Sequence, residues 1–382
     1  MNVLIVGAGF SGAVIARELA ADGHQVLVID ERAATAGNCH TARDPETGVM
    51  VHTYGPHIFH TDSQRVWDYV NAFGVMMPFR NQVKARVGNR VLSLPVNLHT
   101  INQFFDTCLS PDEARAFVTG LADTSITDPV TFEDQALRFV GPDLYRAFFY
   151  GYTRKQWGVE PSALPASILK RLPLRFNYDD NYFNHRFQGM PRDGYSAIID
   201  AILDAPGITL RLNCRAEDVV GDFDHTIYSG PLDRYYGACF GPLTYRTLTF
   251  ERFVHAGDFQ GTAVMNYCDI DVPYTRIAEH KHFAPWESAD LPLSVCFREY
   301  SSAAGPGDIP FYPVRLVDDK RRLEHYVARA KQDSGVTFVG RLGTYAYLDM
   351  DVTILRAMET VTALRTAWAS GSRAPAFVHD PL

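Results

Sequence analysis

The chain has few cysteines and no apolar segment long enough to cross a membrane. Its six cysteines (39, 108, 214, 239, 268 and 296) are dispersed along 382 residues, and none forms a C-x-x-C pair. This spacing predicts neither a disulfide framework nor a cysteine metal site, and a reducing compartment is the simplest setting. No apolar run reaches the length of a membrane span. Because the first apolar strand begins at residue 3, we expect no signal peptide and a cytoplasmic protein.

Positive charge is also scarce. The chain has 36 Lys and Arg against 44 Asp and Glu, which gives a net charge of −8. A protein of this sign has no general affinity for nucleic acid, so any anion site has to be a local group of basic residues. The sequence also lacks a nucleophile elbow with a Ser-His-Asp order, a kinase signature set and a second G-x-G-x-x-G turn. These absences argue against hydrolases, kinases and enzymes with a separate pyridine-nucleotide site.

A nucleotide-binding turn stands at the start of the chain. The segment VLIVGAGFSG is an apolar strand that leads into Gly7, Gly9 and Gly12, and a helical pattern and a second strand ending in Asp30 follow. Gly7 permits the tight turn, Gly9 lets the backbone approach a pyrophosphate, and Gly12 lets the helix pack on its strand. We therefore predict a Rossmann-like site in which Asp30 binds a ribose hydroxyl.

The residues after Asp30 favour FAD over NAD. The continuation ERAATAGN, residues 31–38, resembles the E-x-R-x-x-x-G-G segment of the FAD-containing family that includes amine oxidases. Arg32 can reach a phosphate, and Gly37 permits close passage of the chain near a flavin. Ala36 departs from the pattern because it replaces the first glycine of the pair.

The remaining patterns predict an interrupted nucleotide domain. Residues 83–94 read as a β-hairpin, and the signals from about 98 to 170 are helical, with a capping box at Ser110–Glu113. Alternating apolar residues, typical of strands, return at 244–250, 260–267, 274–283 and 293–298. A strand at Thr337–Gly340 and an amphipathic helix at Asp351–Trp368 close the chain. Since strand–turn–helix patterns stand at both ends, we expect both ends to build the nucleotide domain.

Seven segments carry a family resemblance. In chain order they are GPHIFHT at 55–61, SLPVNL at 93–98, RFNYDDNYF at 175–183, QGMP at 188–191, PYTR at 273–276, EHKHF at 279–283 and GRL at 340–342. Together they resemble the bacterial UDP-galactopyranose mutases, and the resemblance extends from Val3 to Asp351.

We accordingly expect an α/β fold with a Rossmann-like FAD-binding domain, an inserted helical bundle and an antiparallel β-sheet domain. The expected FAD-binding domain comprises residues 1–77, 188–236 and 315–382. The helical substrate-binding domain comprises 96–172, and the sheet domain comprises 78–95, 173–187 and 237–314. The resemblance also implies a homo-oligomer, a dimer or higher.

The resemblance implies an FAD enzyme, active when reduced, that interconverts UDP-galactopyranose and UDP-galactofuranose for a cell-wall or cell-surface polysaccharide. In that reaction N5 of the reduced flavin attacks the anomeric carbon and UDP leaves. The resulting flavin–sugar adduct opens the sugar ring, and the 4-hydroxyl closes the furanose. No side chain is then the nucleophile, and the protein positions the sugar and retains UDP.

Matches to the family imply three sets of site residues. The catalytic set is Arg171, Arg276 and His60. The cofactor-binding set is Gly7, Gly9, Phe10, Ser11, Gly12, Asp30, Glu31, Arg32, Asn38, His57, Ile58, Val219, Arg341, Asp349 and Met350. The substrate-binding set is Asn81, Phe148, Phe149, Tyr152, Thr153, Trp157, Arg171, Tyr182, Asn266, Arg276, Tyr312, Tyr347 and Asp349.

Each assignment has a structural alternative. The two arginines suit a diphosphate, because a guanidinium forks onto phosphate oxygens. By themselves, however, Arg171 would be a solvated loop residue and Arg276 half of a salt bridge. The aromatic residues of Leu144–Trp157 suit a uracil, with Tyr152 as the stacking ring, but an aromatic helix face without a ligand is ordinary core.

Histidines at 52–60 and 280–282 raise the question of a metal. The H-x-x-H pair of His57 and His60 has loose ligand spacing, and we expect no metal. The resemblance instead places the 55–60 loop against the flavin. It also implies that the helix starting near Asp351 directs its positive end at the flavin.

Two other classes stay open. An FAD-dependent oxidase or desaturase of the amine-oxidase class shares the nucleotide segment, but would have an apolar substrate tunnel and no paired arginines. A non-catalytic flavoprotein that binds nucleotide-sugars would bind UDP equally with its flavin oxidised or reduced.

Overall fold

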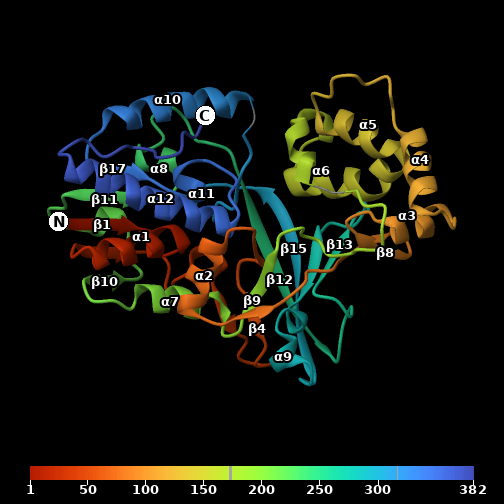
Figure 1. Cartoon of the computed structure of the whole chain (residues 1–382), viewed down its shortest axis with the longest axis horizontal. Coiled ribbons are helices and arrows are strands. Elements are labelled where there is room, and N and C mark those ends of the chain that lie inside the picture. The colour runs from red at the N-terminus through yellow and green to blue at the C-terminus, as the bar shows by residue number, and fades with distance from the viewer. Residues whose placement is uncertain (172–173, 316) are drawn as a thin grey trace.

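The computed structural model describes residues 1–171, 174–315 and 317–382, without the side chains of Ser167, Lys170, Arg171, Val317 and Asp318. Three groups of elements share the chain (Figure 1). A parallel sheet with its helices lies on the left, a cluster of helices on the upper right, and a large mixed sheet between and below them.

The parallel sheet confirms the Rossmann-like prediction. Its strands, in spatial order, are β10 (Ile208–Arg211), β2 (Gln25–Ile29), β1 (Asn2–Val6), β11 (His225–Tyr228) and β17 (Val336–Phe338), and all neighbours are parallel. Strands of such a sheet are buried on both faces, which explains the apolar runs at both ends of the sequence. α1 (Phe10–Ala21) and α12 (Met350–Ala369) pack together on this sheet. The two ends of the chain therefore meet in one layer.

The second sheet is mixed rather than purely antiparallel. Its order is β16 (Tyr312–Pro313), β12 (Tyr245–Ala256), β15 (Leu293–Ala303), β14 (Arg276–Glu279), β13 (Val264–Tyr267), β7 (Val83–Val87) and β8 (Arg90–Leu94). The β7–β8 pair is the predicted hairpin. The expectation of an antiparallel sheet was wrong at one place, because β7 and β13 run parallel. That pairing joins segments about 180 residues apart, and strand alternation carries no information about partner direction.

Several predicted strands are shorter or longer than expected. The stretch predicted at 274–283 is a strand only at β14, and residues 280–283 form a 3₁₀ turn, η6 (His280–Phe283). β13 begins four residues after the predicted start at 260, whereas β12 and β15 extend beyond their predicted ends. β17 ends before Gly340, which begins the short helix α11 (Gly340–Gly343).

The helical cluster contains α3 (Leu98–Phe105), α4 (Pro111–Leu121), α5 (Phe132–Leu144), the π-helical turn η2 (Tyr145–Tyr150) and α6 (Gly151–Trp157). The capping box of Ser110 and Glu113 is confirmed at the start of α4. The expected helical run is broken at Gly141, which has φ 76° and ψ 173°. The turns η3 (Pro161–Ala163) and η4 (Ala166–Arg171) follow α6.

Smaller elements connect these groups. A three-stranded sheet has the order β5 (Phe59–Thr61), β9 (Phe187–Pro191) and β6 (Met76–Pro78). The others are η1 (Gly37–Cys39), β3 (Thr41–Arg43), β4 (Met50–His52), α2 (Gln64–Phe73), α7 (Gly194–Leu203), η5 (Ala216–Asp218), α8 (Leu232–Tyr235), α9 (Pro285–Ser288) and α10 (Val317–Gln332). Within the described ranges, no helix combines the length and apolar character that crossing a bilayer requires.

Candidate active site

The glycine turn at the carboxyl end of β1 has the geometry that a dinucleotide needs. Gly7 has φ +109°, and a Cβ there would lie 2.0 Å from the Ser229 hydroxyl. A Cβ on Gly12 would lie 1.9 Å from the carbonyl oxygen of Gly7, so α1 packs directly on the turn. At Gly9 the nearest atom to such a Cβ is 3.9 Å away. Two of the glycines are thus required by the fold itself, while the third leaves a face open at the N-terminus of α1.

Asp30 and Arg32 lie beside this turn. The buried Asp30 carboxylate accepts hydrogen bonds from the backbone N–H of Ala8 and of Arg32, each at 2.9 Å. Arg32 donates from Nη2 to the side chain of Asn38 at 2.9 Å, and its guanidinium lies 4.6 Å from the Tyr54 ring centre. Its Nη1 is buried and has no hydrogen-bond partner among the described residues. A buried cationic donor without a partner, next to an open glycine turn, fits a phosphate-bearing cofactor.

Ala36, where the family pattern has glycine, has a left-handed backbone conformation. Its φ is 73° and its ψ is 0°, and its N–H donates to the Ala8 carbonyl at 2.9 Å. An L-residue in this left-handed region costs on the order of 1–2 kcal/mol. Ala36 therefore holds a conformation that glycine adopts more readily.

Arg276 begins β14 and is held by a carboxylate that sequence reasoning missed. Its Nε and Nη2 bond to Oε2 of the buried Glu299 at 2.8 and 2.7 Å. Burial alone lowers the pKa of Arg276, but the Glu299 carboxylate outweighs this and raises it, so the guanidinium stays charged. Register pairs Arg276 with Glu299 on β15 and with Asn266 on β13. The side chain is 21% exposed, so both interpretations of Arg276, salt bridge and anion donor, are compatible with its position.

The charge of Arg276 acts on three tyrosines. Burial raises the pKa of Tyr152, Tyr182 and Tyr312, and the Arg276 charge acts on each of them in the opposite direction. Tyr312 stacks on Tyr347 with ring centres 5.5 Å apart and an interplanar angle of 13°. The hydroxyls of Tyr152, Tyr182 and Tyr312 therefore stay protonated. These neutral donors come from distant parts of the chain and are all influenced by one cation.

Arg341 lies under the stacked tyrosine pair. Its guanidinium is 5.5 Å from the Tyr312 ring centre and 5.0 Å from that of Tyr347. It donates to the backbone carbonyls of Phe311 at 3.2 Å and Leu348 at 2.6 Å. Arg341 thus connects the tyrosines to the segment that enters α12.

His57 lies in the loop before β5, and His60 lies on β5. Nδ1 of His57 is 2.8 Å from the Gly55 carbonyl, and burial, together with the charge of Arg341, lowers the pKa of His57 to about 4. His60 stacks on Phe183 with ring centres 3.8 Å apart. Burial lowers its pKa, against the nearby Asp349 carboxylate, and its buried Nδ1 has no partner in the described part of the chain. Both imidazoles are held neutral at pH 7.

Asp349 and Met350 lie where α12 begins. Asp349 is the N-cap residue of this helix, but its side chain makes no capping hydrogen bond. The positive end of the α12 dipole therefore lies close to His60, since Asp349 acts on the charge of that ring.

The aromatic helix divides into core and exposed residues. Phe148 and Phe149 are buried, and Phe148 packs on Phe104 with ring centres 5.6 Å apart. Thr153 is also buried, whereas Tyr152 and Trp157 retain partial exposure. Of this set, Tyr152 is the ring that acts on Arg276.

Asn81 is a buried residue behind Tyr182. Its carbonyl accepts from the Tyr182 N–H at 2.8 Å, and its side-chain Oδ1 is buried without a partner among the described residues. An orphaned acceptor of this kind fits a hydroxyl donor from a bound molecule.

Other predicted site residues are not brought together in this way. The side chain of Arg171 lies outside the described part of the chain, and its backbone ends η4. Glu31 is exposed, and Val219 caps η5. Phe10 and Ser11 are buried at the start of α1, and Ile58 is partly exposed in the 55–60 loop.

Of the histidines considered as metal ligands, His52, His60 and His280 pack against other rings. His52 and His280 stack with ring centres 5.9 Å apart, and the backbone N–H of His52 donates to Nδ1 of His280. A different group, Asp258, Glu279 and His282, has its ligand atoms within 4.8 Å of one another. Lys281 already bonds the Asp258 carboxylate at 3.0 Å, so this group is a charged network within the fold.

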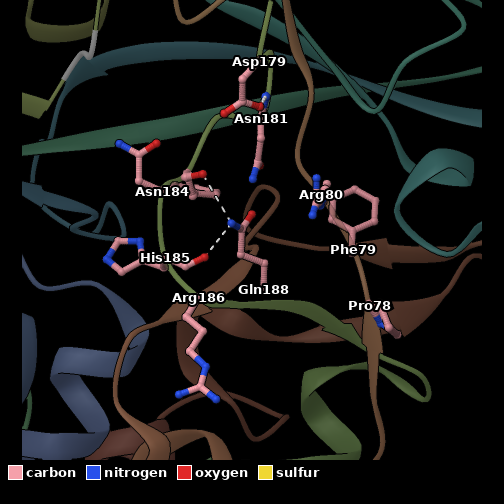
Figure 2. Close-up of a pocket in the computed structure, with 10 residues that line it drawn as sticks. Pro78, Phe79, Arg80, Asp179, Asn181, Asn184, His185, Arg186 and Gln188 are labelled. Carbon is pink, nitrogen blue, oxygen red and sulfur yellow. Dashed lines mark hydrogen bonds between the residues drawn. The ribbon is translucent and has the colours of Figure 1, made fainter. Parts of the chain in front are cut away.

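A polar cavity of about 720 Å³ adjoins the predicted substrate residues (Figure 2). Arg80, Asn181 and Phe183, the chain neighbours of Asn81 and Tyr182, help to line it. Figure 2 shows the Gln188 amide bonded to two backbone carbonyls, those of Phe183 and His185. These bonds fix the segment that carries Tyr182 and Phe183.

Glu299, Lys155 and Tyr54 are the residues that sequence reasoning missed. Glu299 lies beyond the predicted strand 293–298, and its pairing with Arg276 depends on register. Lys155 lies three residues after Tyr152 on a predicted helix, which places both on one face. Tyr54 directly precedes the Gly55 segment, and no sequence signal connects it to Arg32.

The glycine turn, the buried acid after β2 and the parallel sheet define a Rossmann-like dinucleotide-binding protein. The sequence model of the UDP-galactopyranose mutase family matches residues 147–347, and that of an NAD(P)-binding Rossmann-like domain matches residues 5–73. The chain belongs to the UDP-galactopyranose mutase family and is a flavoprotein isomerase.

Relatives match almost the whole chain. A probable UDP-galactopyranose mutase of Klebsiella pneumoniae is 58% identical over 98% of this chain and 98% of its own length. A dTDP-fucopyranose mutase of Escherichia coli is 51% identical over 94% of this chain and 97% of its own length. The crystal structure of a reduced UDP-galactopyranose mutase shares the fold, with a TM-score of 0.74 at 14% identity, over 96% of this chain and 95% of the other.

Proposed function

We propose that this protein interconverts UDP-galactopyranose and UDP-galactofuranose with a reduced FAD. The observation that carries the proposal is the partly exposed Arg276, whose charge acts on Tyr152, Tyr182 and Tyr312, in a chain 58% identical to a probable UDP-galactopyranose mutase. A cation among neutral donors suits a diphosphate whose charge grows as its bond to the sugar breaks.

The nucleotide half of the substrate is assigned to the helical cluster and β13–β14. Tyr152 is the ring proposed to stack on uracil, with Asn266, opposite Arg276 in the sheet, at the base edge. Tyr182, Tyr312 and Tyr347 donate to the diphosphate. Arg171 is proposed as a second diphosphate ligand, on the family resemblance alone.

The cofactor is assigned to the glycine turn. Asp30 binds the ribose, and the open face at Gly9 and the unpartnered Nη1 of Arg32 bind phosphate oxygens. When bound and reduced, the flavin supplies the nucleophilic nitrogen for the anomeric carbon. His57, His60 and the N-terminus of α12 would surround its ring system, and the helix dipole favours negative charge there.

The sugar is assigned to the space beside Asn81. Its orphaned Oδ1 is an acceptor for a sugar hydroxyl, and a site built for a hydroxyl discriminates against analogues that lack it. Asp349, near His60, is the other proposed sugar contact.

A second candidate substrate is a dTDP-linked 6-deoxy sugar, because a dTDP-fucopyranose mutase is 51% identical over nearly the full length. The two candidates differ in the sugar 6-hydroxyl, the ribose 2′-hydroxyl and the base methyl group. The chemistry at the anomeric carbon is the same for both.

The test supplies dithionite-reduced, FAD-loaded protein with UDP-galactofuranose or with dTDP-fucofuranose. Chromatography follows formation of each pyranose, and kcat/KM is compared. The proposal predicts the higher kcat/KM for UDP-galactofuranose. A higher value for the dTDP-sugar would transfer the assignment to the second candidate. In a parallel sample with oxidised FAD and no dithionite, oxidation of either sugar with reduction of the flavin would favour the oxidase class.

Three broader assignments stay part of the proposal. They are the domain boundaries given above, a homo-oligomeric state and a cytoplasmic location. Limited proteolysis tests the boundaries, because cleavage at the ends of 96–172 would release the helical part as one fragment.

A further inference from the structure

The ammonium of Lys155 is bound in a ring of backbone carbonyls. Its Nζ donates to the carbonyl oxygens of Tyr267 at 2.7 Å, Asp269 at 2.9 Å, Val272 at 2.9 Å and Tyr274 at 3.0 Å. An ammonium has three N–H donors, so four acceptors share them. None of the ion pairs found among the described residues includes Lys155. Four carbonyls therefore replace its water shell.

Three of these carbonyls belong to one connection, and the fourth is that of Tyr267, which ends the strand before it. Residues 268–275 join β13 to β14, and the connection lies between Asn266, on β13, and Arg276, at the start of β14. Lys155 itself lies on α6 between Tyr152 and Trp157. The Lys155 side chain thus connects two parts of the site. One is α6, which carries the proposed base-stacking ring of Tyr152, and the other is the turn before the proposed phosphate ligand Arg276.

The contact between α6 and this turn leaves no free space. A Cβ on Gly151 would lie 2.2 Å from the Cys268 carbonyl oxygen and 3.0 Å from the Ile270 nitrogen. α6 is also bound to the sheet at its other end, where Arg246 donates from Nε to the Gln156 carbonyl at 3.0 Å and the Ser301 hydroxyl donates to it at 2.7 Å. The helix ends are therefore fixed independently, and among the described residues of α6 it is Lys155 whose side chain hydrogen-bonds the 268–275 connection.

We propose that Lys155 is a positioning residue that sets the distance between the uridine-binding face of α6 and Arg276, so that its loss weakens nucleotide binding. The inference rests on the proposed function, since the face and the cation are those assigned above to UDP. Lys155 touches neither Tyr152 nor Arg276 by a hydrogen bond; it acts through the backbone of the two segments that carry them.

The positive charge of Lys155 contributes to this positioning role. Burial lowers its pKa to about 8, and Cys268 and Asp269, which face it from the turn, act in the opposite direction. The ammonium form supplies three donors and the amine only two, so the ring of carbonyls is best satisfied below pH 8.

Two variants and one matched control test the inference. Lys155→Met keeps the aliphatic stem and removes the donors, whereas Lys155→Arg keeps the charge in a planar fork that cannot converge on four oxygens. Lys281→Met is the control, because Lys281 binds Asp258 and the Leu291 carbonyl beyond the far end of β14. All three are prepared with FAD, and UDP affinity, KM, kcat, melting temperature and flavin content are measured.

Lys155→Met is expected to raise the UDP dissociation constant and KM by about tenfold or more, the loss typical of a charged hydrogen-bonding group, with flavin content and kcat largely retained. Lys155→Arg should recover only part of this affinity. Lys281→Met should lower the melting temperature without changing UDP affinity. Unchanged UDP affinity in Lys155→Met, with wild-type protein that binds UDP, would overturn the inference.

Hydrogen–deuterium exchange provides a readout that needs no substrate. Lys155→Met should accelerate exchange in residues 151–157 and 268–275 but not in β12 or β15. Equal exchange in variant and wild type would overturn the inference even if the protein proved not to bind UDP. Faster exchange in Lys155→Met, together with a wild-type protein that bound no UDP, would instead refute the proposed function.

Discussion

Single residues at the glycine turn separate the requirements of the fold from those of a ligand. Gly7 and Gly12 have no room for a side chain because other parts of the chain occupy it, whereas Gly9 has room that no described residue fills. The sequence motif predicts all three glycines alike. Only the packing shows that a side chain has room at Gly9 but not at the other two.

Gly9→Ala should therefore preserve the fold and lose the cofactor. The backbone at Gly9 is extended, with φ −85°, so alanine causes no strain, and its methyl would occupy the face assigned to the pyrophosphate. We expect a colourless protein whose apo melting temperature matches that of wild-type apoprotein. Gly12→Ala is the contrasting variant and should fail to fold stably, since its methyl meets the Gly7 carbonyl. Full flavin content in Gly9→Ala would contradict the assignment of this face.

Arg276 has a structural and a chemical role that can be separated. Arg276→Ala should lower kcat by about 10²–10³-fold and, by leaving Glu299 uncompensated, cost about 3–5 kcal/mol of stability. Arg276→Ala with Glu299→Gln removes the unpaired charge as well. Urea unfolding of this double variant should show much of the lost stability restored, while turnover stays low. Turnover that returned together with stability would mean that Arg276 is only half of a salt bridge.

Single residues could be predicted where the signal lay in the neighbouring sequence, but their partners from distant segments could not. The resemblance identified Arg276, and alternation placed it on a strand, but Glu299 became its partner through a strand register that no local pattern encodes. Arg32 was likewise predicted as a phosphate ligand, but the Tyr54 ring beneath it was not. Partners from distant segments are fixed by the tertiary fold.

At the scale of elements, the sequence predicted where some helices and strands begin and end, but it did not predict the breaks inside a helical run. The Ser110 capping box and the strand Gln25–Ile29 are found where the sequence places them. The helical pattern across 132–157 concealed the break at Gly141 and the π-helical turn at Tyr145–Tyr150. The apolar residues keep a similar spacing through both, so periodicity could not reveal them.

Gly141→Ala should destabilise the helical cluster. Gly141 has φ 76°, and a Cβ there would lie 2.4 Å from the Leu121 carbonyl oxygen of α4. Strain and overpacking together predict a loss of about 2–5 kcal/mol, measured by urea unfolding. Gly120→Ala is the matched control on α4: it has no neighbour within 4 Å and should gain about 0.5–1 kcal/mol. A neutral Gly141→Ala would show that the break is not required.

At the scale of the whole molecule, the buried histidines predict how stability depends on pH. Burial lowers the pKa of His57 and His225 to about 4 and that of His280 to about 3, and it places the pKa of His52 well below its ordinary value. The unfolded chain binds these protons near pH 6.5. The free energy of unfolding should therefore fall as the pH is lowered from about 6.5 to 4, by up to about 1.4 kcal/mol per pH unit for each histidine.

His282 acts in the opposite direction and offsets part of this loss. The Glu279 carboxylate raises its pKa, so its contribution to stability is present at low pH and lost as the pH rises through the raised value. Urea unfolding at pH 7, 6 and 5 gives the net slope. His225→Asn should reduce the slope by about one proton. Equal stability at pH 7 and pH 5 would contradict neutral burial of these rings.

The overall architecture follows from the meeting of the two chain ends in one sheet, which the strand–turn–helix patterns predicted. The direction of the β7–β13 pair and the fitting of α6 to the 268–275 connection needed the structure. The proposed nucleotide site depends on the whole fold, because its ligands come from the helical cluster, the mixed sheet and the segment after β16.

The most direct test of the central claim is the dependence of isomerisation on the oxidation state of the flavin. FAD-loaded protein is incubated with UDP-galactofuranose, once oxidised and once after reduction with dithionite, and UDP-galactopyranose is measured by chromatography. We predict turnover only in the reduced sample, its loss on reoxidation, and no net flavin oxidation by the sugar. Equal rates in the two oxidation states, or no pyranose in either, would contradict the account.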